Sequence, residues 1–269
     1  MAKQIGLWIM LLLINASIAL GSPLEGSPLL IGPGVSHQQM IPIDQESTYA
    51  FTLWVQGSLV NAVVSLSVQL LDANGSQVGV AKVYRGIGDP AQWYPLGVEI
   101  TSPKSVITAR ITLTADRKGD YRWNALSVVK LDTSVDGIRE FWEEKFELYG
   151  QVYTGLVIDG RGQGLLRGMS PRVVSESGQL IYGGITATYE YVQNIGLVAY
   201  GPELSNALFS RIQVDESYPL AVPLVLEAIA VEGMSRTNAV ISDQAAEEIL
   251  TALAAYDFLA RFAVIFLVD

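Results

Sequence analysis

The sequence contains no cysteine among its 269 residues. Disulfide bonds, thiolate catalysis, iron–sulfur clusters, thiolate zinc sites and lipidation of an N-terminal cysteine are therefore excluded. Histidine is almost absent too, because His37 is the only one in the chain. A catalytic triad needs a base held beside a nucleophile, and His37 has no such sequence context. We expect a surface or edge histidine, and no metal site.

Charged residues are scarce, and basic ones are the scarcer kind. Lys, Arg, Asp and Glu make up 16% of the chain, and 27 acidic against 17 basic residues give a formal net charge of −10. Nucleic acid is not expected as a partner, because phosphate contacts need clustered lysine and arginine. Hydrophobic residues reach 50%, which predicts a proper core, and the low share of charged residues predicts some apolar surface that a partner covers.

The first residues are typical of a secretory signal peptide. Lys3 supplies a short basic start, residues 5–14 are apolar, and small residues such as Ala19 and Gly21 follow. Removal of residues 1–21 predicts a secreted, periplasmic or cell-surface location. The alternative is a membrane anchor, but the apolar run is shorter than the roughly 20 residues that span a bilayer. No stable membrane span is expected after processing.

Pattern and composition divide the remaining chain into four segments. Residues 22–34 are rich in Pro, Gly and Ser and predict an extended arm that packs on its own domain or on a neighbouring subunit. Residues 35–132 alternate in short strands punctuated by turns, which predicts an all-β jelly-roll sandwich. Residues 133–150 have helical spacing and predict a linker helix that ends at Gly150. Residues 151–269 mix strands and helices and predict an α+β domain.

The sequence also predicts individual strands, helices and core positions that the structure can test. Tyr49, Phe51, Leu53 and Val55 should share one strand face. The sequence further predicts one final sandwich strand over 122–131, core positions for Trp54 and Trp123, a helix over 203–212, a strand over 224–231, a helix from the Ser242 cap to about Arg261, and a buried central strand over 262–268.

Aromatic side chains are the leading ligand-binding candidates of the first domain. Sugar rings stack their C–H faces on exposed Trp and Tyr rings while polar side chains bind the hydroxyls. Trp93 and Tyr94 follow the loop over 86–92, and Tyr84 and Arg85 stand just before it. The alternative for Trp93 and Tyr94 is packing in the core or between domains.

A glycine-rich turn over 159–164 is the second candidate. Its glycines do not have the spacing of a dinucleotide-binding loop, and no helix obviously follows. One interpretation is a small-anion or nucleotide site around Arg161. The other is a strand-exit turn in which Asp159 and Arg161 pair with neighbours or with Arg172 and form a subunit contact.

Carboxylates occur, but nothing in the sequence pairs them for hydrolysis of glycosides. Glutamates over 140–147 are expected on the solvated face of the linker helix. We therefore expect no catalytic residues, no enzyme activity and no cofactor. Acidic residues numerically available for such a pair are Glu99, Asp116, Asp159 and Glu190.

The first domain resembles the jelly-roll carbohydrate-binding modules and their galactose-binding-like relatives. The segments that carry this resemblance are Tyr49 to Val55, Leu70 to Gly75, Trp93 with the run to Pro103, and Gly119 to Val129. The modules often have an acidic residue after the last aromatic one, where this chain has Asn124. The resemblance implies a sandwich fold, a polysaccharide ligand and a structural calcium ion whose ligands the sequence does not place.

The second domain resembles secreted bacterial proteins of undefined function, which are similar in turn to flagellar-associated envelope lipoproteins. Relatives are expected to have a basic residue near Glu227 and an alanine near Gly160, so charge-dependent contacts are in doubt. The resemblance implies an envelope location and assembly. The segments that carry it are Tyr153 to Gly162, Met169 to Arg172, Gly178 to Gly183, Pro223 to Leu226, Val240 to Asp243, and Val264 to Asp269.

The sequence leaves three functional hypotheses. The first is an exported structural or assembly protein of the envelope or extracellular space, a self-associating subunit that binds itself or other envelope proteins. The second is a surface carbohydrate-binding protein. The third, an enzyme, would need a carboxylate pair that faces a cleft.

Overall fold

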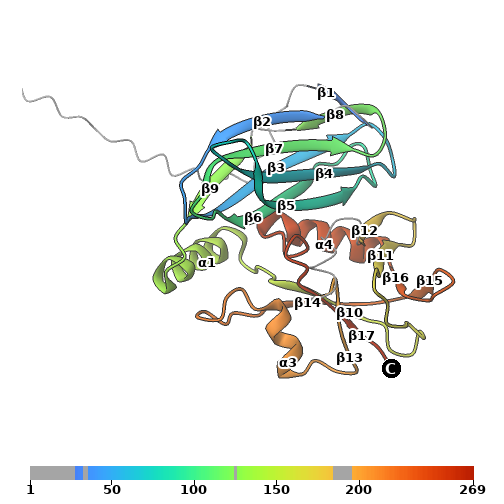
Figure 1. Cartoon of the computed structure of the whole chain (residues 1–269). Coiled ribbons are helices and arrows are strands. Elements are labelled where there is room, and N and C mark those ends of the chain that lie inside the picture. Colours follow the sequence, from blue (N-terminus) through green and yellow to red (C-terminus); the bar gives the residue numbers. More distant parts are fainter. Residues whose placement is uncertain (1–27, 33–35, 124–125, 184–195) are drawn as a thin grey trace, which may run out of the picture.

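The computed structural model describes residues 28–32, 36–123, 126–183 and 196–269. It contains a β-sandwich, a linker helix and a mixed α+β unit (Figure 1). The predicted fold class is confirmed, because the four sheets divide between the two halves of the chain and none is shared. The predicted signal peptide over 1–21 and most of the predicted arm over 22–34 lie outside the described residues.

Two antiparallel sheets form the sandwich. Part of the predicted arm belongs to it, since Pro28–Ile31 pairs with the chain's own strand Gly119–Trp123. The first sheet contains β1 (Pro28–Ile31), β8 (Gly119–Trp123), β3 (Thr48–Gly57), β6 (Tyr94–Thr101) and β9 (Ser127–Leu131). The second contains β2 (His37–Pro42), β7 (Val106–Ala115), β4 (Val63–Asp72) and β5 (Gln77–Gly86).

Alternation along β3 and β4 builds the sandwich core. Successive side chains of a strand point to opposite faces, so every second residue enters the same layer. Tyr49, Phe51, Leu53 and Val55 are buried on one face of β3, as predicted. Their neighbours on the opposite face are free to meet another part of the chain.

The predicted final strand over 122–131 is wrong, because it is two strands. Both pair with β3, through Val55 with Trp123 and Thr52 with Ser127. On β3, two residues lie between Thr52 and Val55. On the other side of the ladder, three residues lie between Trp123 and Ser127. The two ladders therefore differ in register by one residue.

Helix α1 (Val135–Tyr149) joins the two units as predicted. The Ser134 side chain accepts a hydrogen bond from the Gly137 N–H at 3.1 Å and caps its start. Gly150 ends it with a φ of 74°, a conformation that glycine adopts without a Cβ clash, and donates to the Phe146 carbonyl.

The C-terminal unit contains a parallel sheet and a mixed sheet. Strand β17 is fully buried at the centre of the first sheet, as its apolar sequence predicts. The parallel sheet has the order β13 (Ala199–Gly201), β17 (Val264–Leu267), β10 (Gly155–Asp159) and β14 (Pro223–Glu227). The mixed sheet has the order β12 (Leu180–Gly183), β11 (Arg172–Ser175), β16 (Asn238–Ile241) and β15 (Ala230–Glu232).

The predicted single strand over 224–231 is also wrong. The backbone N–H of Ala228 donates to Asp159 in the parallel sheet, and that of Ile229 donates to Val240 in the mixed sheet. The chain therefore changes sheets between these two residues. Periodicity within one segment does not record which partner strand each residue meets.

The helices are shorter than predicted. The segment over 203–212 forms only α3 (Asn206–Phe209) and η1 (Ser210–Ile212). Helix α4 (Asp243–Ala255) begins at the predicted Ser242 cap and ends six residues before Arg261. It ends because Tyr256 is extended, with a φ of −157°. Within the described residues, no helix has both the length and the apolar character to cross a membrane.

The two units pack tightly against each other. Figure 1 shows α4 beneath β5 and β6, between the sandwich and the lower sheets. Leu250 of α4 and Ala260 pack against the sandwich core. A Cβ at Gly86 would lie 2.4 Å from the Leu180 carbonyl oxygen, so the absence of a side chain permits this approach.

Candidate functional site

The predicted ligand contact at Tyr94 is not supported, because the side chain is 1% exposed. Its hydroxyl accepts hydrogen bonds from the N–H groups of Gly88 and Asp89 at 3.0 and 2.6 Å and donates to the Asp89 carbonyl. Desolvation raises its pKa. Tyr94 holds the loop after β5 in place and belongs to the core, which was the alternative interpretation.

Arg85 is also unavailable to a ligand from solvent. Its side chain is 1% exposed, and Nη2 forms an ion pair with Asp257 Oδ2 at 2.6 Å across the boundary between the units. Nε donates to the Pro95 carbonyl at 3.1 Å. Arg85 therefore joins the sandwich to the C-terminal unit, and this role was not predicted.

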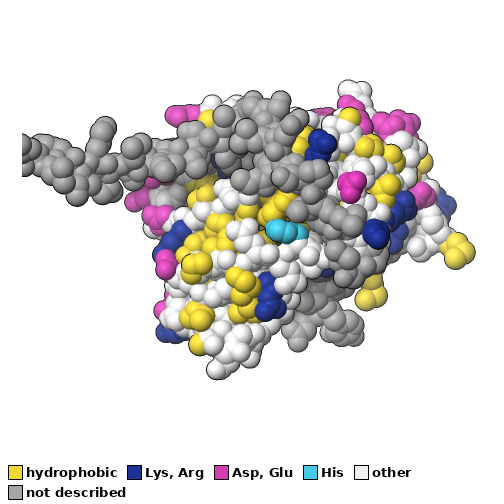
Figure 2. Space-filling model, turned by 90° about the horizontal axis from the view of Figure 1, so that it is seen from above, with side chains coloured by type: hydrophobic (Ala, Val, Ile, Leu, Met, Phe, Trp, Pro, Cys, Tyr) yellow, Lys and Arg dark blue, Asp and Glu magenta, His cyan; other side chains and the backbone are white. Residues whose placement is uncertain are grey.

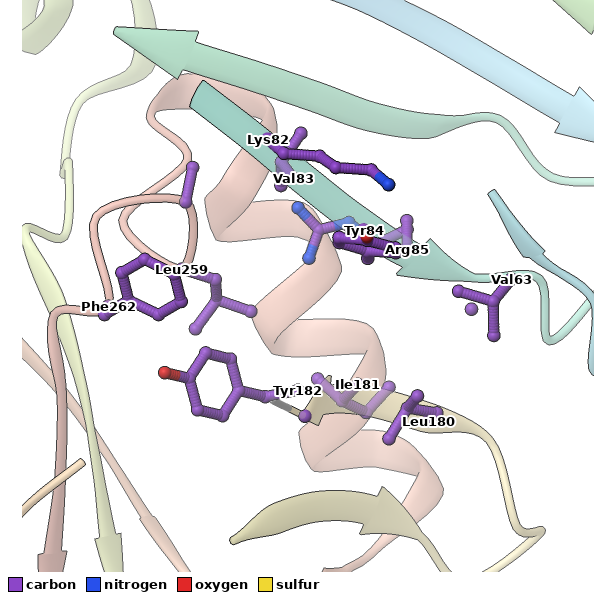
Figure 3. A pocket seen from close by; sticks show the side chains of 13 residues that line it. Val63, Lys82, Val83, Tyr84, Arg85, Leu180, Ile181, Tyr182, Leu259 and Phe262 are labelled. Atoms are coloured by element: carbon purple, nitrogen blue, oxygen red, sulfur yellow. The ribbon is translucent and has the colours of Figure 1, made fainter. Parts of the chain in front are cut away.

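A small cavity borders Arg85. Figure 3 shows the Arg85 side chain extending from β5 toward Leu259, and Tyr182 lines the cavity on the side away from β5. The cavity measures about 30 Å³, room for about one water molecule. Arg85 Nη1 is buried and has no hydrogen-bond partner within the described residues. The cavity is too small for a sugar ring.

Trp93 and Tyr84 are half-buried. Tyr84 lies under the ammonium group of Lys82, with Nζ 4.5 Å from its ring centre. The four predicted residues do not converge on one open surface, because Tyr94 and Arg85 point into the protein.

The glycine-rich turn contains a local ion pair. Asp159 and Arg161 bind each other, and Arg161 Nη1 donates to the Pro202 carbonyl at 3.1 Å. The Arg161 side-chain hydrogen bond lowers the pKa of Asp159. Arg172 lies on β11 in the other sheet. Arg161 thus pairs with its neighbour Asp159 and not with Arg172, and a subunit contact at this turn stays a prediction.

His37 lies on β2, an edge strand of the sandwich. Its ring meets Trp123 edge-to-face with centroids 4.7 Å apart. In the face shown in Figure 2, the histidine is surrounded mainly by uncharged side chains, and acidic ones lie toward the margins. Within the described residues, no group of three or more His, Asp or Glu side chains is placed to hold a metal ion.

The candidate site lies elsewhere, in a cleft between the two units that we call the interdomain cleft. It consists of a hollow of about 530 Å³ and an adjoining one of about 430 Å³. Glu99, Glu144 and Arg261 line both hollows, so the two are continuous. A volume of this order is typical of small-molecule sites.

The outer face of the first sandwich sheet forms one wall of the cleft. Thr52 and Trp54 alternate with the buried residues of β3. On β6, the buried Gly97 and the exposed Glu99 line the same wall. Trp54 is half-buried and lines the cleft, so its predicted core position is wrong. Trp123 is half-buried as well, but it packs against the sandwich core.

One face of α1 forms the opposite wall. Phe141, Glu144, Lys145, Leu148 and Tyr149 line the cleft, and their spacing of three, four, seven and eight residues is that of one helix face. Glu144 is exposed as predicted, but it is exposed to the cleft. Trp142 fixes the helix against the C-terminal unit: it is 3% exposed, borders the adjoining hollow, and meets Tyr256 edge-to-face at 4.8 Å between centroids.

Glu99 projects into the cleft. Its side chain touches solvent there, yet desolvation by the surrounding protein raises its pKa. The positive charges of Arg261 and Lys145 oppose that rise, and the negative charge of Asp257 adds to it. The Glu99 side chain has no hydrogen bond and no ion pair with the described residues, and its charge interacts with those of Arg261 and Lys145 at longer range.

The cations of the cleft are already engaged. Lys145 Nζ donates to the Ala255 carbonyl at 2.7 Å and lies 4.8 Å from the Phe141 ring centre. Burial lowers its pKa, and the charges of Glu99 and Glu144 act in the opposite direction. Arg261 donates to the Tyr256 hydroxyl at 2.7 Å and to the Val214 carbonyl at 2.9 Å.

The sequence contained a signal for part of this site. The spacing of Phe141, Lys145 and Tyr149 marks one helix face, but it does not say what that face meets. Glu99 was one of several unpaired acidic residues. Glu99 and the helix face come together only because the segment after α4 docks under β6. Its Asp257 accepts a hydrogen bond from the Gly97 N–H, 160 residues away in the chain.

The fold and the cleft define a two-domain protein with a β-sandwich, an α+β domain and an aromatic and acidic groove between them. In the C-terminal half, residues 155–269 match the family described as Treponema pallidum Tp0624, second domain. The predicted resemblance is confirmed to that extent. No curated protein is significantly similar to the chain.

Solved structures similar to this chain include three with carbohydrate-binding modules. A CBM4 module is 11% identical over 35% of this chain and 60% of its own length, with a TM-score of 0.29. A family 16 carbohydrate-binding module is 18% identical over 39% and 75%, with a TM-score of 0.28. The CBM22-1–GH10 modules of Clostridium thermocellum xylanase 10B are 16% identical over 44% and 22%, with a TM-score of 0.29. Similarity at this level gives no ligand.

Proposed function

We propose that this is an exported, non-catalytic carbohydrate-binding protein of the bacterial envelope or cell surface, and that its ligand binds in the interdomain cleft. The observation that carries the proposal is that half-buried aromatic rings and carboxylates line the same open groove. Aromatic rings receive the C–H faces of a sugar, and carboxylates accept hydrogen bonds from its hydroxyls.

The geometry favours an elongated ligand. The two hollows adjoin, and residues from the sandwich, α1 and the C-terminal unit line them. A chain of several sugar rings fits a groove of this kind better than a single ring, since each additional ring meets further lining residues. The location outside the cytoplasm rests on the predicted signal peptide.

Binding should be measured by isothermal titration calorimetry on the mature protein with soluble oligosaccharides. Trp54→Ala should weaken binding about tenfold, as the loss of one aromatic contact commonly does. Trp93→Ala is the matched control, because Trp93 is half-buried on the same sandwich and is not among the lining residues. Equal loss in both variants, or loss only in Trp93→Ala, would show that the cleft is not the site.

The non-catalytic part of the proposal has its own readout. Glu99 and Glu144 lie on opposite walls, an arrangement that glycosidases use when two carboxylates flank the bond to be cleaved. We expect the bound oligosaccharide to be recovered intact after long incubation. Hydrolysis that disappears in Glu99→Gln would make the protein an enzyme.

Assembly is the second candidate function, and a specific surface favours it. Strand β14 is an edge of the parallel sheet, and Val225 on it is 51% exposed. Ile229, just after it, is 48% exposed. Exposed apolar edge strands pair readily with other chains. Light scattering on Val225→Lys should show loss of self-association, with Val80→Lys on edge strand β5 as control. A monomeric parent protein at high concentration would remove this candidate.

A further inference from the structure

The three most exposed large apolar side chains of the described residues lie on two loops of the C-terminal unit. Met234 is 107% exposed, Met169 77% and Leu166 54%. Leu166 and Met169 precede β11, and Met234 lies in the turn between β15 and β16. Single exposed apolar side chains are common on soluble proteins, but a group of them marks an interaction site.

The two loops lie at the same end of the mixed sheet, because they lead into the parallel neighbouring strands β11 and β16. Hydrogen bonds hold them against each other. The Leu166 N–H donates to the Arg236 carbonyl at 2.8 Å, and Arg236 Nη2 donates to the Gln163 carbonyl at 3.1 Å. The Tyr200 hydroxyl also donates to the Gly168 carbonyl at 3.0 Å. We call the surface formed by Leu166, Met169 and Met234 the apolar tip.

The apolar tip is surrounded by basic residues in an otherwise acidic chain. Residues 162–172 and 233–238 contain three arginines and no acidic residue, whereas the whole chain has 27 acidic and 17 basic residues. The arginines are exposed, and none forms an ion pair with another described residue. They are Arg167, Arg172 and Arg236. Methionine and arginine are both enriched in protein interfaces, so this surface fits an acidic protein partner.

Helix α1 presents a surface of the complementary charge. Glu140, Glu143 and Glu147 are exposed, and their spacing of three and four residues places them on one face of the helix. None of the three forms an ion pair with another described residue, and the neighbouring Arg139 is paired with Asp136. Like charges at this spacing repel, so a basic partner would stabilise the helix.

We infer that the apolar tip of one copy docks on the acidic face of α1 of a second copy. The inference rests on assembly, the second of the two proposed functions. Figure 1 shows α1 and β15 at opposite margins of the molecule, so the two surfaces of one chain do not meet each other. Leu148, 43% exposed beside Glu147, adds apolar surface on the α1 side.

Such a contact is heterologous, because it joins two different surfaces. Each bound copy keeps one surface free for the next copy, which gives a ring or a filament. An anionic lipid surface would also attract the arginines, but it would repel a chain whose net charge is −10. Charge complementarity therefore favours a second copy of this chain.

Sedimentation of the mature protein from about 1 μM to about 1 mM tests the contact. Met234→Asp changes the apolar tip, and Glu143→Lys reverses a charge on α1. Each should move the midpoint of self-association at least about tenfold toward higher concentration. Met40→Asp and Glu248→Lys are the matched controls and should assemble as the parent protein does, because Met40 is 53% exposed on β2 and Glu248 is exposed on α4. Thermal unfolding checks that each variant is folded.

A mixture of the two variants gives the sharpest readout. Met234→Asp keeps a native α1, and Glu143→Lys keeps a native apolar tip, so the two together can form one intact contact. Mixed at equal concentrations, they should form a dimer with one copy of each and nothing larger. A mixture that stays monomeric, or that forms the larger species of the parent protein, would overturn the inference.

The remaining outcomes separate this contact from assembly in general. A parent protein that assembles, with both variants unchanged and Val225→Lys monomeric, would refute the inference and leave assembly through β14 standing. A monomeric parent protein would remove both and leave carbohydrate binding untouched. A monomeric parent protein that sediments with phosphatidylglycerol vesicles, while Met234→Asp does not, would assign the apolar tip to a lipid surface and likewise refute the inference.

Discussion

The ion pair between Arg85 and Asp257 should hold the two units together. Arg85 is 1% exposed and Asp257 6%, and the pair is 2.6 Å apart. Removing one partner of a buried pair leaves the other charge without compensation, at about 3–5 kcal/mol. Asp257 keeps hydrogen bonds from the N–H groups of Gly97 and Ala260. We therefore expect Arg85→Met to lower the free energy of unfolding by about 3 kcal/mol, the lower end of that range.

A double-mutant cycle tests the pairing directly. Arg85→Met, Asp257→Asn and the double variant are unfolded in urea, followed by tryptophan fluorescence and circular dichroism. The double variant should be less destabilised than the sum of the single ones by about 2 kcal/mol, because residues in direct contact are not additive. The same substitutions should also alter the interdomain cleft, because Asp257 is one of its lining residues.

The control is the partly exposed pair of Asp159 and Arg161 on the glycine-rich turn, whose side chains are 24% and 46% exposed. Arg161→Met should change the free energy of unfolding by less than about 1 kcal/mol, because water screens ion pairs that it reaches. If Arg85→Met cost less than about 1 kcal/mol, or if the single effects simply added, the ion pair would not couple the units and the account of the interface would be refuted.

Three further predictions follow from the same interface. Gly86→Ala should destabilise the protein by about 2 kcal/mol in urea, because a Cβ there would lie 2.4 Å from the Leu180 carbonyl oxygen, whereas Gly97→Ala, at 3.4 Å from Asp257, should not. Trp142→Ala should cost about 3–5 kcal/mol by the same assay and increase proteolysis at α1; unchanged protection of α1 would contradict its anchoring role. Glu99 keeps its proton to a higher pH in the folded than in the unfolded chain, so the melting temperature should fall as pH rises through and above about 4.5. Glu99→Gln should make this fall less steep. An identical pH dependence in the parent protein and the variant would contradict the raised pKa.

The fold was largely accessible from the sequence, because its signals are local. Alternation places Phe51 and Leu53 in the core, and the run over 262–268 predicts the buried strand β17. Ser134 and Gly150 mark the ends of α1 through backbone capping, which depends on a few neighbouring residues. Errors arose where a distant partner decides the outcome. The strand over 224–231 divides because two different sheets claim its two parts.

The site was less accessible. Tyr94 and Trp54 are both strand aromatics, and only the packing of a second unit decides which face is closed and which is a cleft. Arg85 looked like a rim cation because its partner, Asp257, lies 172 residues away. No local pattern encodes such a pair. The sequence predicted that aromatic residues of the sandwich matter, and the structure moves the candidate site from Trp93 to Trp54.

The most direct test of the central claim is a crystal structure of the mature protein with a bound soluble oligosaccharide. We predict sugar rings in the interdomain cleft, between Trp54 on β3 and the exposed face of α1, with a sugar hydroxyl within hydrogen-bonding distance of Glu99 or Glu144. Ordered sugar on the outer face of β4, β5 and β7, or around Trp93 with the cleft unchanged, would contradict the account.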